Sequence, residues 1–328
     1  MNRLVLPGLE AHNPLAFFAA LGLLRVLADD ARRRAAPAPR LAFEDAGMLV
    51  AAIETDLARD EVIAAVLRDA VAQADNRALQ LAYDEDGKVV PPSTEDATRD
   101  LKPSQSADGA RALLEAVVTA DRRASDLAAA WFAEGAADRS GKTKPTAFHF
   151  TAGQQAFLDM VEKLRAELNA EHVREALFGP WTNTSQLPSL SWDSSAARMY
   201  ALRATNPSGE KRGSVPGANW LAVNGLTFFP VAARGGQLTT RGVEGGWKDS
   251  TFTWPVWTPP ADARTVGSLL RLDVASWTAA QRRVAGVTVV FQSRILRTDQ
   301  GGYGSFSPAG PVPPRGRRPD GGRSKPAR

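Results

Sequence analysis

The chain contains no cysteine. This absence excludes disulfides, zinc sites with thiolate ligands, iron–sulfur clusters and cysteine nucleophiles, and it fits a reducing compartment. Long apolar runs are also missing. The longest run, Pro14 to Leu24, is too short to span a bilayer, and the first residues show no apolar core of a secretion signal. We therefore expect a cytoplasmic protein with no membrane partner.

Catalytic and metal-binding motifs are scarce as well. The three histidines, His12, His149 and His172, have none of the short spacings of a metal site, and no G-x-S-x-G elbow is present. Gly-Lys-Thr at 141–143 ends like a phosphate-binding loop, but the motif needs a glycine where Ala136 stands. We expect no metal, no cofactor and no catalytic residue. Distant carboxylates brought together by the fold remain an open alternative.

The charge that is present is unevenly distributed. Residues 1–175 hold 21 Lys and Arg against 28 Asp and Glu, which is −7, whereas residues 176–328 hold 19 against 8, which is +11. Part of the excess lies in a Pro- and Gly-rich end, residues 315–328, but residues 176–314 keep +6 without it. Such asymmetry favours an anionic partner for the second half. A solvated, disordered end is the simpler explanation for the tail alone.

The first part of the chain is expected to be mainly helical, with a few short strands. Asn13-Pro14 predicts a helix start, and the apolar residues that follow predict a buried helix in which Gly22 permits close packing. The further expectations are one or two helices over 47–75, a strand at 79–83, a long loop over 84–109, and helices at about 109–133 and 152–178.

The second part has a different composition. Seven of the eight tryptophans follow Phe178, together with many Gly, Pro and Thr residues, and β character is seen at 198–203, 226–232, 251–257 and 284–297. We predict an α+β protein with three regions: a mainly helical scaffold (1–178), a basic, Trp-rich, loop-rich α+β region (179–298) and a disordered basic tail (299–328). With 328 residues, the chain fits one large or two ordinary domains.

Basic and amide side chains gather on Gly-rich segments. Cations neutralise phosphates, amides read base edges, and exposed aromatic rings stack on unpaired bases. We therefore predict a nucleic-acid-binding surface. The alternative for its cations is that they lie on solvated loops without a partner. The alternative for most of the aromatic residues is that they belong to the core. Its residues are Arg139, Lys142, Thr143, Lys144, Arg203, Asn206, Lys211, Arg212, Asn219, Arg234, Gln237, Arg241, Trp247 and Lys248.

Four stretches carry a resemblance to a known family: LPGLEAHNPLAFFAALGLLRVL, KPTAFHFTAGQQAFLDMV, SWDSSAARMYALRATNPSGEKRGSVPGANWLAVNGLTFFPV and FTWPVWTPP. In this order they resemble the large-subunit proteins of CRISPR type I-G (formerly I-U) systems, over most of residues 4–260. Beyond residue 299 there is no resemblance. The quoted motifs are structural in character, not catalytic.

The resemblance implies a non-catalytic subunit of a Cascade complex, an antiviral ribonucleoprotein. Such a subunit caps a filament that carries CRISPR RNA, recognises the motif that flanks the target (the PAM) in foreign double-stranded DNA, helps to open the duplex and docks a helicase-nuclease. Amides such as Asn206, Asn219 or Gln237 would then contact bases, while loop cations hold phosphates. Two alternatives stay open: a scaffold that contacts only RNA or neighbouring subunits, and a hydrolase with a Trp-rich pocket.

Overall fold

The computed structural model describes residues 1–86, 88–101, 111, 114–115, 117–118, 121–136, 144–151, 155–196, 213–297 and 303–316. Within them the protein is mixed α+β with several small sheets. The helices are α1 (Pro14–Arg33), α2 (Arg59–Ala72), α4 (Arg122–Trp131), α5 (Phe157–Ala166), α6 (Ala170–Phe178), α7 (Pro216–Gly225), α8 (Ala263–Leu269) and α9 (Ala279–Val284), with 3-10 turns η1 (Ser194–Ala196), η4 (Leu226–Phe228) and η5 (Val274–Ser276). The strands are β1 (Asn2–Glu10), β2 (Arg40–Asp45), β3 (Leu49–Thr55), β4 (Val231–Arg234), β5 (Gln237–Thr240), β6 (Val243–Glu244), β7 (Thr251–Trp257), β8 (Val287–Arg297), β9 (Gly304–Phe306) and β10 (Gly310–Pro311).

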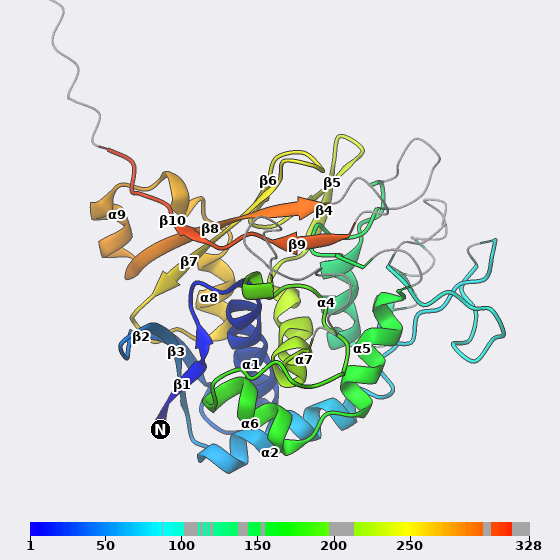
Figure 1. The fold of residues 1–328 in the computed structure, drawn as a ribbon, viewed down its shortest axis with the longest axis horizontal. Coiled ribbons are helices and arrows are strands. Elements are labelled where there is room, and N and C mark those ends of the chain that lie inside the picture. The colour runs from blue at the N-terminus through cyan, green and yellow to red at the C-terminus, as the bar shows by residue number, and fades with distance from the viewer. Residues whose placement is uncertain are drawn as a thin grey trace, which may run out of the picture.

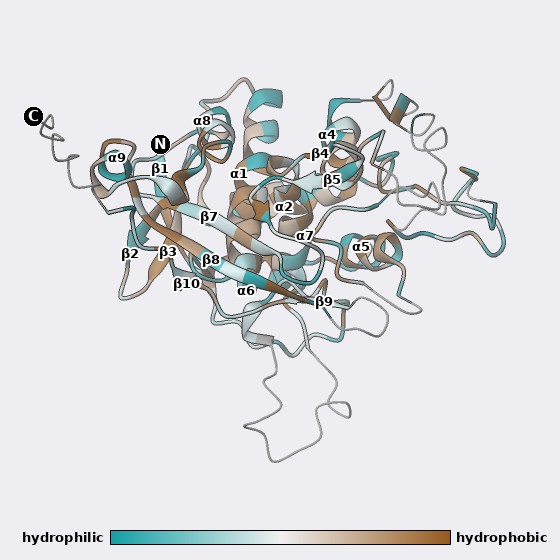
Figure 2. Cartoon of the chain, turned by 90° about the horizontal axis from the view of Figure 1, so that it is seen from above, coloured by the Kyte–Doolittle hydropathy of each residue, from teal (hydrophilic) through white to brown (hydrophobic). Residues whose placement is uncertain are grey.

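Helix α1 runs through the middle of the molecule (Figure 1). Its start is as predicted: Asn13 is the N-cap, its side chain accepts a hydrogen bond from the amide of Leu15, and Pro14 is the first helical residue. Nearly every position of the helix is buried, because apolar residues surround it on all sides. Figure 2 shows these hydrophobic residues inside the molecule.

Helix α7 packs directly against α1, and all ten of its residues are buried. The two backbones touch where Gly22 meets Leu221 and where Gly225 meets Phe18. A Cβ atom at either glycine would overlap the carbonyl oxygen of the facing helix. The close packing predicted for Gly22 is therefore confirmed, and its partner is a helix that begins almost two hundred residues later.

The first sheet has the order β1-β3-β2, with antiparallel neighbours. It corrects the prediction of helices over 47–75, because 49–55 is the central strand β3 and only 59–72 is helical. Strand β3 is buried almost throughout, so its side chains do not alternate between polar and apolar. A short apolar run of this kind cannot be told from a buried helix by periodicity.

The second sheet has the order β10-β8-β7-β6, with β9 also paired to β8. The strand predicted at 251–257 is confirmed as β7. The strand predicted at 284–297 is confirmed from 287 on as β8, since Val284 is the last residue of α9, whereas 226–232 starts as the turn η4 and only its end enters β4. The stretch 198–203 lies outside the described residues. Most of the aromatic residues considered for the interface lie in the core, which is the alternative given above. They are Trp220, Phe228, Phe229, Trp254 and Trp257.

One hydrophobic core joins the two predicted regions. Phe17 of α1 contacts both Trp254 and Trp257 of β7. Each tryptophan also donates its indole N–H to a carbonyl of the first region, Trp254 to Ala11 at 2.9 Å and Trp257 to Leu41 at 2.8 Å. The core therefore crosses residue 178 instead of stopping there.

The connecting segments differ in part from the predictions. The expected strand at 79–83 is a turn followed by isolated bridges of Tyr83 to Val89 and to Thr98. The described part of the predicted loop over 84–109 has no helix or strand element. Of the helix expected at 109–133, residues 122–131 form α4, and the described residues 111, 114–115 and 117–118 before it are helical too. The helix expected at 152–178 is divided into α5 and α6.

The C-terminal segment 303–316 corrects the prediction of disorder from residue 299. It pairs with β8 as β9 and β10, and Arg282 of α9 holds it in place. This arginine is 5% exposed and donates to the carbonyls of Val274, Ala275 and Val312 at 3.2, 2.9 and 2.7 Å. A buried guanidinium needs hydrogen-bond acceptors, and the C-terminal segment supplies one of them through the carbonyl of Val312.

Across the part of the chain that the structure describes, no helix has both the length and the apolar character needed to cross a membrane.

Candidate nucleic-acid interface

The predicted interface residues fall into two groups. One group lies outside the described residues: Arg139, Lys142, Thr143, Arg203, Asn206, Lys211 and Arg212. The other is described: Lys144, Asn219, Arg234, Gln237, Arg241, Trp247 and Lys248.

Asn219 is in the interior, contrary to its predicted role as a base contact. It lies on α7, is 1% exposed, and its amide already has partners on both sides. The side-chain oxygen accepts from the amide of Leu190 at 3.0 Å, and the side-chain nitrogen donates to the carbonyl of Val215 at 3.0 Å. Asn219 therefore fastens the loop before η1 to α7, and we remove it from the interface.

Trp247 is the exposed aromatic residue of the interface. It lies on the loop between β6 and β7 and is 51% exposed. The guanidinium carbon of Arg297 lies 3.7 Å from the centroid of the indole ring. Arg297 is itself held from behind, because it donates to the carbonyls of Ala147 at 2.6 Å and His149 at 3.2 Å. The ring is thus supported by a fixed cation, an arrangement that suits stacking on a base.

Arg297 remains a cation although it is largely enclosed. Burial lowers its pKa to about 10. At neutral pH the guanidinium is still protonated, because the pH lies well below that value. Its positive charge is met by backbone carbonyls and by the indole ring of Trp247, none of which carries a full negative charge. The charge of Arg297 therefore adds to the potential of the surface above it.

Arg234 and Gln237 occupy the tip of the hairpin formed by β4 and β5. They face each other as the last pair of the ladder. Gly235 and Gly236 join them, with φ of 57° and 74°, the left-handed conformation that a tight two-residue hairpin turn requires. Both side chains are exposed. The cation of Arg234 and the amide of Gln237, which the sequence predicts separately, therefore lie side by side at the tip of the hairpin.

The segment that begins at Lys144 connects the hairpin to the Trp247 loop. The amide of Ala147 donates to the hydroxyl of Thr240, at the end of β5, at 2.9 Å. The carbonyl of the same residue accepts from Arg297, which supports Trp247. Lys144 is half-buried, and Lys248 is exposed beside Trp247. Segments predicted from three places in the sequence therefore form one assembly.

A buried hydrogen-bonded cluster fixes the other end of this segment. His149 lies 2.7 Å from the carboxylate of Asp100, which also accepts from the backbone amide of Phe157 at 3.1 Å, at the start of α5. Burial by itself would raise the pKa of Asp100, but the hydrogen bond and charge of His149 together with backbone amides hold it below its usual value. The cluster holds the backbone around His149 against the start of α5. Among the described residues, no group of three or more His, Asp or Glu side chains is placed to hold a metal ion.

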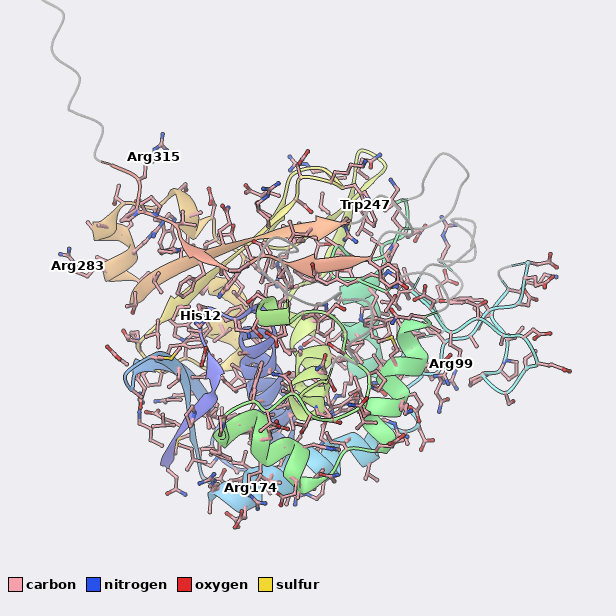
Figure 3. All side chains as sticks on the ribbon, viewed as in Figure 1. His12, Arg99, Arg174, Trp247, Arg283 and Arg315 are labelled. Carbon is pink, nitrogen blue, oxygen red and sulfur yellow. The ribbon has the colours of Figure 1, made fainter. Side chains whose placement is uncertain are left out.

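The described arginines of the second region differ from those of the first in their ion pairs. No arginine in 213–297 or 303–316 forms an ion pair with a described carboxylate; the recorded pairs lie between residues 3 and 174. Figure 3 shows Arg283 and Arg315 at one end of the layer formed by β7 and β8, and Trp247 at the other. Sequence reasoning missed Arg264, Arg283, Arg294, Arg297 and Arg315 as interface candidates. The excess of positive charge in the second half was the available signal, but a count of charged residues does not show which of them form ion pairs.

Arg241 has a different setting from the exposed cations. Its side chain is half-buried and donates to the carbonyl of Phe228 at 2.9 Å. It lines a cavity together with Arg271, from the segment that follows α8. Burial, followed by the nearby charge of Arg271, lowers the pKa of Arg241.

Comparison with models of known protein families gives no match for this chain, and comparison with curated proteins gives none either.

Proposed function

We propose that this protein is a nucleic-acid-binding, non-catalytic subunit of a CRISPR-RNA-guided type I surveillance complex. One observation carries the binding part of the proposal: arginines without carboxylate partners lie in the same layer as an exposed tryptophan that a fixed cation supports. Arginines that form no ion pair with a described carboxylate can neutralise phosphates instead. The assignment to a surveillance complex comes from the sequence resemblance.

In this proposal the described residues have distinct roles. Arg234 and Arg294 hold phosphates, Gln237 contacts a base edge, and Trp247 stacks on a base. A stacking tryptophan needs a base that has left the duplex stack, which suits a subunit that helps to open DNA beside a flanking motif. The partners are CRISPR RNA, target double-stranded DNA, filament subunits and a helicase-nuclease. The loop cations outside the described residues belong to the same proposal.

The binding part is tested by the salt dependence of affinity. Fluorescence anisotropy of a labelled duplex with a short single-stranded overhang, titrated between 50 and 200 mM NaCl, yields the slope of log K against log salt. Arg234→Gln is expected to lower that slope by about one unit. Arg174→Gln is the matched control, because Arg174 is paired with Glu171 in the acidic region, and its slope should equal that of the wild type. Equal slopes for all three proteins would contradict the proposal.

The assembly part is tested by co-purification of the tagged chain, expressed with its genomic neighbours, followed by sequencing of bound nucleic acid. Repeat-derived RNA of uniform length together with several other subunits is the expected result. Recovery of a lone protein would remove the assignment to a surveillance complex. If the complex forms but its DNA binding ignores the flanking motif, the scaffold alternative is favoured instead.

The hydrolase alternative receives little support from the described residues. Its pocket was expected to be Trp-rich, but Trp220, Trp254 and Trp257 are core residues. Two carboxylates of the second region, Glu244 and Asp273, do line one cavity. Two arginines, Arg241 and Arg271, line the same cavity, and they favour binding of an anion over hydrolysis by a pair of carboxylates.

A further inference from the structure

The cavity beside Arg241 is lined by residues other than Trp247. It has a volume of about 230 Å³ and is enclosed by the turn between β5 and β6, by β7, and by the segment that follows α8. Its apolar wall includes Phe229, Pro255 and Leu270. At another part of the wall Gln292 donates to the hydroxyl of Thr253 at 3.1 Å. The cavity thus combines an apolar surface with hydrogen-bonding groups and two arginines.

Two arginines, Arg241 and Arg271, and two carboxylates, those of Glu244 and Asp273, line the cavity. Neither Arg241 nor Arg271 forms an ion pair within the described part of the chain, and they face one cavity. The pKa of Arg241 is lowered by burial first and by the charge of Arg271 second. An anion in the cavity offsets the repulsion that Arg271 exerts on Arg241.

The two acidic residues of the cavity do not supply that anion. Asp273 caps the turn η5, where its carboxylate accepts from the amide of Ser276. Glu244 is exposed at the end of β6 and makes no ion pair with either arginine. Neither carboxylate therefore pairs with Arg241 or Arg271, and both arginines are placed to bind an anionic ligand.

We infer that this cavity binds a phosphate group, held between the guanidinium groups of Arg241 and Arg271. Arginine matches phosphate with parallel N–H donors, and the charge of the half-buried Arg241 is screened less by solvent than that of an exposed side chain. The apolar wall accepts the carbon atoms that a phosphate ester carries. The phosphate comes either from a free nucleotide or from the 5′ end of a nucleic-acid strand. The inference does not need the proposed function, since it concerns a cavity and not the exposed layer.

Thermal unfolding of the full chain tests this inference. The midpoint is measured in Hepes buffer with sodium phosphate, and again with sodium chloride at the same ionic strength. Phosphate is expected to raise the midpoint by about 2–4 °C, because a ligand that binds only the folded state stabilises it. Arg271→Gln should abolish the rise and weaken phosphate binding by about tenfold or more in calorimetry. Arg271 is exposed, so this variant is expected to fold.

Arg264→Gln is the matched control, because Arg264 lies on α8 and does not line the cavity. It should keep the full response to phosphate. Two pairs of probes then separate the sources: AMP against adenosine, and a 5′-phosphorylated pentanucleotide against its 5′-hydroxyl form. A phosphate-dependent response to either pair supports the site and names its source.

Two results would overturn the inference. One is a wild-type midpoint that phosphate and chloride change equally. The other is an equal loss of the response in Arg264→Gln and Arg271→Gln, which would show diffuse attraction to a basic surface. Neither result depends on the salt slope of duplex binding, so failure here is distinguishable from failure of the proposed function.

Discussion

The acidic and the basic regions of this protein satisfy their arginines in different ways. In residues 1–175 arginines pair with carboxylates on other elements: Arg25 bonds Asp126, and Arg123 bonds Asp69. In residues 213–316 the buried arginines bond backbone carbonyls instead, as Arg282 and Arg297 do. A carboxylate cancels the charge that it binds, whereas a carbonyl satisfies the hydrogen bond and leaves the charge in place. The second region therefore keeps a positive field that an external anion can use.

The largest expected effect concerns the contact that unites the two regions. Gly22→Ala places a methyl group against the carbonyl of Leu221 on a buried helix, so we expect a loss of more than about 4 kcal/mol in the free energy of unfolding. Chemical denaturation measures it. Gly267→Ala is the control, because a Cβ there meets nothing within 4 Å, and alanine in α8 should be neutral or stabilising by up to about 1 kcal/mol. If Gly22→Ala produced two separate transitions, the regions would be independent folding units.

The next prediction compares a paired with an unpaired arginine. Arg123→Gln leaves the fully buried carboxylate of Asp69 without its cation, although Gln73 still donates to it at 2.9 Å. We expect a loss of about 3 kcal/mol. Arg294→Gln, at an exposed position without an ion pair, should change the free energy of unfolding by less than about 0.5 kcal/mol. Urea unfolding of the two variants checks the difference, and equal losses would refute the contrast between the regions.

A smaller effect, on binding and not on folding, is expected at Trp247. Trp247→Ala should weaken the affinity for single-stranded DNA by about 1–3 kcal/mol, because the stacking surface is removed. Trp247→Phe should retain most of the affinity. Since the side chain is 51% exposed, the melting temperatures of both variants should stay close to that of the wild type. Anisotropy titrations at fixed salt measure the affinities, and an unchanged affinity of the alanine variant would remove Trp247 from the interface.

The smallest effect is the pH dependence of the cluster at Asp100. Its pKa is lower in the folded protein than the usual 3.8, so the stability that the carboxylate contributes is fully present above that value. It is lost as the pH falls through the folded pKa. Asp100→Asn should therefore destabilise the protein by about 1 kcal/mol at pH 7, and the difference from the wild type should shrink below about pH 4. Denaturation of both proteins at several pH values measures this difference in the free energy of unfolding. A difference that does not change with pH would contradict a stabilising role of the ionised carboxylate of Asp100.

Local signals in the sequence were sufficient for several elements. Asn13-Pro14 marks the start of α1, and the β-branched run of β8 is a strand without help from its neighbours. The β3 segment was mistaken for helix because a strand covered on both faces loses its alternation. Asn219 was placed on the surface because its neighbours are Gly and Pro, although the segment forms a buried helix. The ordered strands at 304–311 were missed because their partner, β8, supplies the ladder.

By itself the sequence determined the chemical classes of the protein: no thiol chemistry, an apolar helix that must be buried, tryptophans that belong mostly to a core, and a basic second half. Tertiary structure alone decided which cations are neutralised. Arg297 supports Trp247 from fifty positions away along the chain, and Arg241 meets Arg271 across a cavity. Composition is a property of residues, but pairing depends on distances between atoms, which exist only once the chain has folded.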